Sequence, residues 1–362
     1  MSASLPGITG SNYSQLSELV ANATELRQQL ATLTEQASSG LVAETYAGLG
    51  SGASVSLDLN PEISQMNTWQ NNINAAQGQM QVTQTAVSQL SAIASNFASQ
   101  LNTIGTADPT AVTNVAAAAQ QALVQVANLL NTTDGTTYVF AGADSANPPV
   151  PNADQILSSG FATQISAAVS GLATNGAAVT EASVLATGSS NAAGTSPFSA
   201  ALSQPAATLQ AELPSVQVGQ GQFVTIGLLA SANSYVPSSG TNTTGSYTRD
   251  LMTSLAVIGS LSTSQVSSPD FQTLVGDTQA TLQGVVTAMN QDAGVLGNQS
   301  SALTSTASTL SDTVNALTTQ VGAVQDVDMA TTATRLTGVQ TELQASYQLI
   351  ANLGSLSLVN YL

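Results

Sequence analysis

Cysteine, histidine and lysine do not occur in this 362-residue sequence, and its three basic residues are all arginines. Their absence excludes thiol nucleophiles, imidazole bases and lysine Schiff bases, and it removes the usual ligands of zinc and other transition metals. Charged residues make up only 6% of the chain, against about a quarter in an average soluble domain. Uncharged polar residues therefore have to keep the protein in solution.

Positive charge is scarce, with 3 basic against 20 acidic residues and a net charge of -17. No basic patch can neutralise phosphates, so the composition argues against nucleic acid and against docking on an anionic membrane. No apolar run is long enough to insert into a membrane, and no basic segment followed by an apolar one marks a Sec signal. The missing signal favours the cytoplasm, whereas the low charge favours an exported structural protein, and composition alone leaves both open.

Carboxylates are the remaining groups that could support catalysis. Asp326 and Asp328 are two residues apart, so on a helix they point in different directions. The single tryptophan, Trp69, lies in a helical stripe and offers no sugar platform for a glycosidase. No calcium-loop motif occurs. The sequence thus predicts no enzyme, and no catalytic, cofactor or metal site.

The last stretch, from about residue 300 to residue 362, has the apolar spacing of a coiled-coil helix. Apolar residues recur at alternating steps of three and four, with a break at Asp326 and Asp328. Because a single helix cannot hide so narrow a stripe, the pattern predicts a partner helix. The stripe consists of Leu310, Val314, Leu317, Val321, Val324, Leu336, Val339, Leu343, Tyr347, Ile350 and Leu353, and a further apolar run, Leu356 to Leu362, ends the chain.

The partner is expected near the N-terminus, where residues 11–38 show the same spacing after a flexible leader at 1–10. Gly40 follows as a C-cap. An ordinary amphipathic helix on a globular core is the alternative reading. The stripe here consists of Leu16, Leu19, Ala23, Leu26, Leu30, Leu33 and Ala37.

A second long helix is predicted from Pro61, as its first residue, to Ile104, and a third from Pro109 onward. At 1.5 Å per residue the former would be on the order of 60 Å long, so the molecule is expected to be elongated. Its stripe runs through Met66, Trp69, Ile73, Ala76, Met80, Thr83, Val87, Leu90, Ala94, Phe97, Leu101 and Ile104.

The middle of the chain, rich in Gly, Pro, Ser and Asn, predicts an inserted domain. We expect a strand over Thr136–Phe140, a short helix over residues 164–172 and a hairpin over 216–229 that turns at Gly219–Gly221. Helices are expected again over 247–261 and 269–289, with residues 291–299 separating them from the last helix. The predicted fold is mainly α: an elongated bundle of long N- and C-terminal heptad helices with an inserted mixed α/β or β-rich domain. Its expected parts are residues 11–142, the insert 143–246, and residues 247–362.

Several motifs resemble the bacterial flagellin superfamily. Ser38-Ser39-Gly40 matches the end of the family's first helix, Asn72-Ile73 its "N-I" pair, and Gly135–Gly142 its "G-x-Y-x-F-x-G" element. Asp326–Ala330 matches "D/E-V-D-x-A". The ending, Ser357–Leu362, is more like the "S-L-L-x-Y-L" of hook–filament junction proteins (hook-associated protein 3) than the ending of filament flagellins. The family's "R-I-N-S-x-x-D-D" segment after the first motif is missing.

The resemblance implies a structural subunit of the extracellular flagellum, exported without a cleaved signal peptide. It would join hook to filament, or form the filament itself. Implied partners are other copies of the chain, flagellin, hook-associated proteins and an export chaperone. From another functional class, a secreted adhesin displaying residues 143–246 stays open. The expected assembly face consists of Leu16, Leu19, Leu26, Leu30, Leu33, Leu343, Tyr347, Ile350, Leu353, Leu358 and Leu362.

Two arginines, Arg27 and Arg335, are the basic residues of the terminal helices. They are either solvated or pair with Glu25, Asp326 or Asp328 on a neighbouring helix or subunit. An exposed pair contributes little in either case.

Overall fold

The computed structural model describes residues 9–104, 109–236, 238 and 242–359; for residues 9–13 and 353–359 it describes the backbone only. The leader expected at 1–10 therefore lies largely outside the described residues. The chain divides into two compact units, Met1–Asn67 with Ser311–Leu362, and Thr68–Leu310. Most described residues are helical, which confirms the predicted mainly α fold with long terminal helices.

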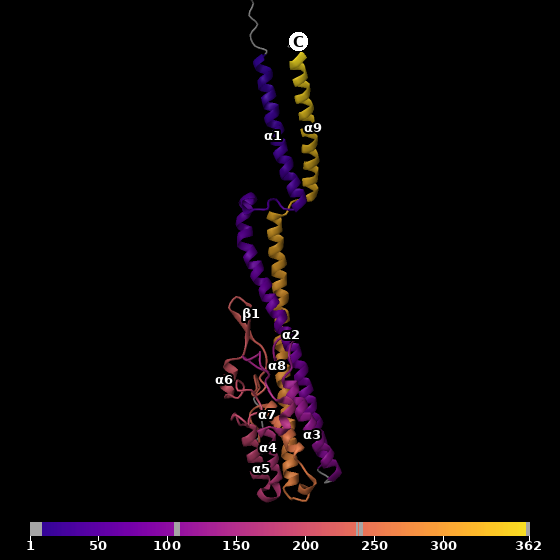
Figure 1. Ribbon diagram of the computed structural model, residues 1–362. Coiled ribbons are helices and arrows are strands. Elements are labelled where there is room, and N and C mark those ends of the chain that lie inside the picture. The colour runs from indigo at the N-terminus through magenta and orange to yellow at the C-terminus, as the bar shows by residue number, and fades with distance from the viewer. Residues whose placement is uncertain (1–8, 105–108, 237, 239–241, 360–362) are drawn as a thin grey trace, which may run out of the picture. The chain divides into compact units, whose positions relative to one another are not determined.

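The first unit is built on the pairing of the two terminal helices. Helix α1 (Thr9–Ser39) lies beside helix α9 (Met329–Val359), as Figure 1 shows at its indigo and yellow ends. A 3-10 helix, η1 (Tyr46–Gly52), leads into helix α2 (Ala53–Ile104). Helix α8 (Phe271–Gln325) ends just before α9 begins, which confirms the break predicted at Asp326 and Asp328.

The start of α2 differs from the prediction. The helix begins at Ala53, and Pro61 lies in its interior, although we expected this proline at the first position. A proline inside a helix lacks the N–H that would bond to the carbonyl four residues earlier, so the helix forgoes one hydrogen bond here.

The second unit has its core between α2, α3 (Pro109–Leu130) and α8. The stripe predicted on α2 is buried from Trp69 to Ile104, and its polar member Thr83 is fully buried. Thr83 donates its hydroxyl to the Gln79 carbonyl within the helix, so its burial leaves no unpaired group.

Uncharged side chains join α2 to α8 along this core. Gln77 donates to Thr304 Oγ1 at 2.8 Å, and Ser91 to Asn290 Oδ1 at 3.3 Å. Gln279 donates to Asn102 Oδ1 at 2.8 Å. Each neutral hydrogen bond of this kind contributes about 1 kcal/mol. Because no charges are involved, the pairing of these two helices should depend little on salt.

Helix α7 (Tyr247–Gly259) is buried on every side. It contacts α3, α4 (Gly160–Ser170) and α5 (Leu172–Gly188), and α3 also contacts the 3-10 helices η2 (Ala153–Ser158) and η3 (Thr263–Gln265). Ser246 caps the start of α7 by accepting from the Arg249 N–H. The short helix predicted over residues 164–172 corresponds to α4.

The predicted hairpin is confirmed with shorter strands. Strand β1 (Ser215–Gly219) pairs antiparallel with β2 (Gln222–Thr225), after the short helix α6 (Ala206–Ala211). Asn72 of α2 donates to the Gln217 carbonyl of β1 at 2.9 Å and so holds the hairpin against the helix.

The strand predicted over Thr136–Phe140 is wrong. This segment forms turns with one isolated bridge, Thr133 to Tyr138. Gly142 has φ 61°, and a Cβ there would lie 2.7 Å from the Leu229 side chain, so the close approach of the two segments requires glycine.

The interruption predicted over residues 291–299 is also absent, because α8 runs through it without a break. Two members of this stretch, Asp292 and Leu296, are fully buried. Their tertiary contacts outweigh the helix-weakening effect of Gly294 and Gly297, which is about 1 kcal/mol each.

Truncation of α7 should show that it organises the second unit. Leu255 is 0% exposed, so Leu255→Ala should lower the free energy of unfolding by about 2–5 kcal/mol. Leu157 is 41% exposed, and Leu157→Ala should cost far less. Chemical denaturation followed by circular dichroism measures both. Equal losses for the two variants would show that α7 is not a core helix.

Candidate assembly interface

The stripe predicted on α1 faces α9 but is not sealed by it. All five of its leucines are half-buried, and Ala23, at 5% exposed, is the buried member of the stripe. A leucine in a closed core would be nearly inaccessible to water. The pairing of α1 with α9 therefore covers the stripe only in part. The five leucines are Leu16, Leu19, Leu26, Leu30 and Leu33.

The stripe on α9 is uneven. Leu343 is 8% exposed and Ile350 is half-buried, whereas Tyr347 is 47% exposed. The side chains of Leu353 and Leu358, and all of Leu362, lie outside the described residues. The structure thus brings Leu343 into contact with its partner helix and leaves Tyr347 at the surface.

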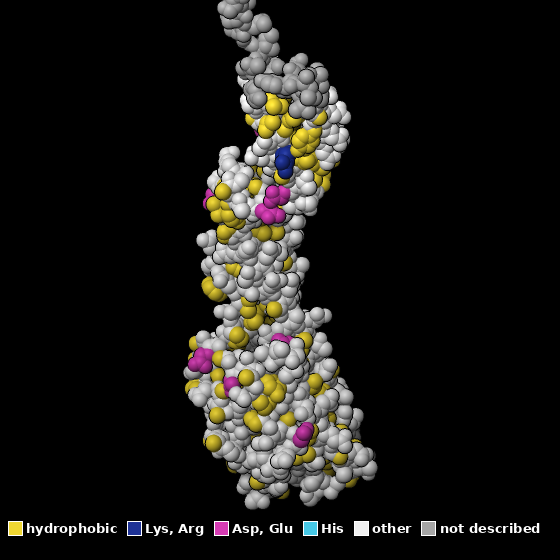
Figure 2. Space-filling view, turned by 45° about the horizontal axis from the view of Figure 1, so that its top comes forward, with side chains coloured by type: hydrophobic (Ala, Val, Ile, Leu, Met, Phe, Trp, Pro, Cys, Tyr) yellow, Lys and Arg dark blue, Asp and Glu magenta, His cyan; other side chains and the backbone are white. Residues whose placement is uncertain are grey.

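More apolar surface lies outside the predicted stripes. Val20 on α1 is 49% exposed, and on α9 Leu349 is 53% and Met329 48% exposed. Figure 2 shows hydrophobic side chains gathered on the visible face of the terminal helices. The three-four spacing missed these residues because they lie beside the stripe rather than on it. Exposed apolar side chains that gather on one face are typical of interaction surfaces.

Two grooves run between α1 and α9. The first is lined by Glu25, Gln28, Gln29, Thr32 and Leu33 of α1 and by Arg335, Gly338, Val339 and Glu342 of α9. The second is lined by Arg27, Leu30, Ala31, Thr34, Glu35, Ser38 and Leu343. Both grooves are lined by apolar, polar and charged side chains together.

Neither arginine of these grooves pairs within the unit. Among the described residues, no carboxylate lies within the 4.0 Å of a salt bridge from Arg27 or Arg335. The ion pairs considered for Glu25, Asp326 and Asp328 are thus not formed inside one chain. Both arginines are exposed and remain available to a neighbouring molecule.

Two backbone hydrogen bonds, which we call the clasp, join the segment just after α1 to the segment just before α9. The sequence pattern did not reveal them. Val42 N–H donates to the Gln325 carbonyl at 2.7 Å, and Val327 N–H donates to the Gly40 carbonyl at 2.9 Å. Gly40 has φ 74°, which glycine adopts without strain. The clasp therefore holds the C-terminal end of α1 next to the N-terminal end of α9.

The buried charged groups of the second unit serve its packing. Arg249 donates to the Ser231 and Gly188 carbonyls and to Asn191 Oδ1, at 2.7, 3.1 and 2.6 Å. Its guanidinium lies 5.0 Å from the ring centre of Phe198, and burial lowers its pKa to about 10. With its donors directed at loop carbonyls, this arginine ties the loops to α7.

Asp292 acts in the same way from α8. It accepts from Val236 N–H at 2.8 Å and from the Tyr247 hydroxyl at 2.9 Å. Burial raises the pKa of Asp292, and burial together with the Asp292 charge raises that of Tyr247 well above its usual value. No group of three or more potential metal ligands occurs among the described residues. Within the same residues, no helix is long and apolar enough to cross a membrane.

Two family models match the chain at the helices just described. The bacterial flagellin N-terminal helical region matches residues 11–145, and the bacterial flagellin C-terminal helical region matches residues 280–362. The chain belongs to the flagellin superfamily. Flagellins are structural, non-enzymatic proteins that assemble into the extracellular flagellar filament, so this flagellin is a structural subunit of the bacterial flagellum. No curated protein matches the chain.

The matched regions are the ones that carry the terminal helices of this flagellin, together with most of α2, α3 and α8. The segment between them, residues 146–279, holds α4 to α7 and the hairpin and lies outside both models. The family assignment thus rests on the helices of the matched regions.

The clasp can be tested with two glycine-to-alanine changes. At Gly40 no atom would meet a new Cβ, so Gly40→Ala should destabilise the α1–α9 pair through its positive φ alone, by about 1–2 kcal/mol. At Gly338, inside α9 and also in open space, the same change should stabilise the helix by about 0.5–1 kcal/mol. Hydrogen exchange of α1 and α9 peptides measures both. Shifts of the same sign would contradict the assignment of the clasp.

Proposed function

We propose that this flagellin is the subunit that joins hook to filament, and that it assembles through α1 and α9. The apolar surface that the two helices leave uncovered carries the assembly argument. Half-buried leucines on α1 and the exposed Tyr347 on α9 would be covered by the same helices of neighbouring subunits. Burial of apolar surface stabilises such contacts by roughly 25 cal/mol per Å².

The choice of the junction over the filament rests on the resemblance of Ser357–Leu362 to the ending of junction proteins. Filament flagellin is the alternative. A uniform filament subunit and a junction subunit use the same terminal pairing, so genetics rather than geometry separates them.

Deletion of the gene distinguishes the two roles. Loss of a junction subunit should leave hooks without filaments and should release flagellin monomers of another gene into the medium. Electron microscopy and analysis of the culture supernatant measure this. Loss of a filament subunit would instead remove the filament with no such release, and persistence of complete filaments would rule out the junction role. Restoration of the gene serves as the control.

A second proposal concerns the state of the chain before assembly. The uncovered stripes of α1 and α9 would favour aggregation in the cell, so an export chaperone that covers them is expected. The unpaired Arg27 and Arg335 would meet carboxylates, such as those of Glu25 or Glu342, on a neighbouring copy at the rims of the two grooves.

The α9 stripe can be tested by a pair of charge substitutions. Ile350 lies on the stripe and is half-buried, whereas Gln348 is exposed beside it. Ile350→Asp should abolish incorporation because a buried unpaired carboxylate costs several kcal/mol, and Gln348→Asp should leave it nearly intact. Microscopy of motile cells measures incorporation, and proteolysis of the purified chain verifies that the second unit stays folded. Normal hook attachment by Ile350→Asp would refute the interface.

A further inference from the structure

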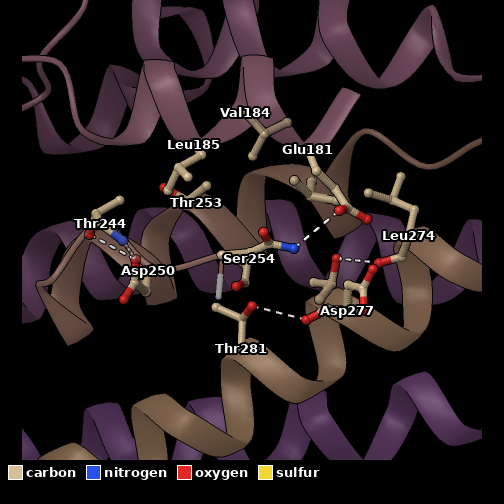
Figure 3. Close-up of a pocket in the computed structure, with 13 residues that line it drawn as sticks. Glu181, Val184, Leu185, Thr244, Asp250, Thr253, Ser254, Leu274, Asp277 and Thr281 are labelled. Carbon is tan, nitrogen blue, oxygen red and sulfur yellow. Dashed lines mark hydrogen bonds between the residues drawn. The ribbon is translucent and has the colours of Figure 1, made fainter. Parts of the chain in front are cut away.

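A small pocket in the second unit brings two acidic side chains together from distant parts of the sequence. Helices α5, α7 and α8 and the segment 242–244 enclose it, and Figure 3 shows Glu181 of α5 and Asp277 of α8 pointing toward one another across it. The two residues come from segments that neither family model matches. Asp277 lies close enough to the Glu181 carboxyl group to help raise the pKa of Glu181.

A hydrogen bond between two carboxyl groups requires a proton. Glu181 Oε2 accepts from Asn242 Nδ2 at 3.1 Å, but Glu181 Oε1 is buried and receives no donor from the described residues. An ionised carboxylate has acceptors only, so an ionised Glu181 cannot donate to an ionised Asp277. The two carboxyl groups can therefore share a hydrogen bond only while one of them is protonated.

The surroundings supply no compensating positive charge. From α7, Asp250 lines the same pocket, and it is already bonded to Thr243 and Thr244. Arg249, next to it on α7, directs its donors to other residues. Asp270, just before α8, approaches Gly176 of α5, and its carboxylate oxygens lie 3.9 Å from where a Cβ on that glycine would be. The titratable side chains that line the pocket are therefore all carboxyl groups, with no basic side chain among them.

Helix α5 is also kinked near this place. Gly176, with φ 77° and ψ 167°, interrupts the helix five residues before Glu181. The part of α5 that follows carries Glu181, Val184 and Leu185 on the pocket side. A non-helical glycine at this position is a natural hinge for that part of the helix.

We propose that Glu181 and Asp277 form a proton-dependent latch, closed while the pair holds one proton and opened by its loss, so that α5 separates from α8 as the pH rises. The latch lies wholly in the second unit and does not depend on the junction role. The opening would expose surface in the part of the chain that lies outside the family models. It is a conformational response to pH built into this flagellin.

The expected pH range follows from the acidity of Glu181. Burial, and then the hydrogen bond and negative charge of Asp277, raise the pKa of Glu181 from 4.5 to about 7, while the Asn242 contact acts in the opposite direction. A raised pKa in the folded state means that the folded chain holds the proton more tightly than the unfolded chain does. The stabilisation is complete below pH 4.5 and is lost as the pH rises through about 7.

The latch is tested on the full chain in its monomeric form. With ¹³C-labelled glutamate, one carboxyl signal should titrate near neutral pH, and Glu181→Gln should remove that signal. Hydrogen exchange of α5 peptides, corrected for intrinsic rates, should increase severalfold from about pH 5 to about pH 8.5 in the wild-type chain. In Glu181→Gln, the neutral side-chain amide can donate a hydrogen bond to Asp277 at any pH. The protection of α5 from exchange should therefore be the same at both pH values.

Two further variants complete the test. Asp277→Asn should return the titration of Glu181 toward its usual range, because the partner charge is gone. Glu212→Gln changes an exposed glutamate of the same unit and should leave both the titration near neutral pH and the exchange of α5 as in the wild type. A Glu181 that titrates in the usual range overturns the proposal. So does a pH-independent α5 in the wild-type chain, even where Glu181 titrates near neutral pH.

Discussion

A long helix with a narrow apolar stripe is stable in water only when another helix covers the stripe, and this constraint shapes the whole chain. In the second unit the stripe of α2 is covered by α3 and α8, and its residues are almost inaccessible to water. In the first unit α1 has α9 beside it, and the stripe stays half-exposed. The same sequence pattern thus yields a closed core in one unit and an open pair in the other.

The scarcity of charge determines how the helices recognise one another. Where many helical proteins use ion pairs, this chain uses amides and hydroxyls, as in the contact of Gln77 with Thr304. Neutral hydrogen bonds lose little on burial when both partners are satisfied, and salt does not screen them. The buried charged residues of the described chain, Arg249, Asp250 and Asp292, are bonded to backbone groups of loops and so fix irregular segments onto α7 and α8.

Sequence periodicity identified the helices because burial follows the three-four spacing wherever two helices pack. It predicted the α2 stripe and the break at Asp326 and Asp328. It failed where local signals and tertiary contacts compete. Pro61 and the glycines of residues 291–299 looked like helix boundaries, but packing around them keeps α2 and α8 continuous.

For the candidate interface, as for the fold, sequence periodicity predicted some features and not others. The half-buried leucines of α1 follow the predicted spacing, whereas the exposed Val20 and Leu349 lie outside it. The clasp of Gly40 and Val42 with the segment around Asp326 depends on backbone hydrogen bonds between the two ends of the sequence, and periodicity carries no information on such contacts. The same holds for Glu181 and Asp277, whose neighbouring residues give no sign that the fold joins them.

The difference between the two units separates folding from assembly. The second unit buries its apolar side chains in a closed core. In the first unit, the pairing of α1 with α9 leaves the leucines of α1 half-buried, and among the described residues no carboxylate pairs with Arg27 or Arg335. In the proposed assembly, copies of the same helices would complete that surface. The terminal helices would then gain part of their stability from neighbouring subunits, because any partner that binds only the folded form stabilises it.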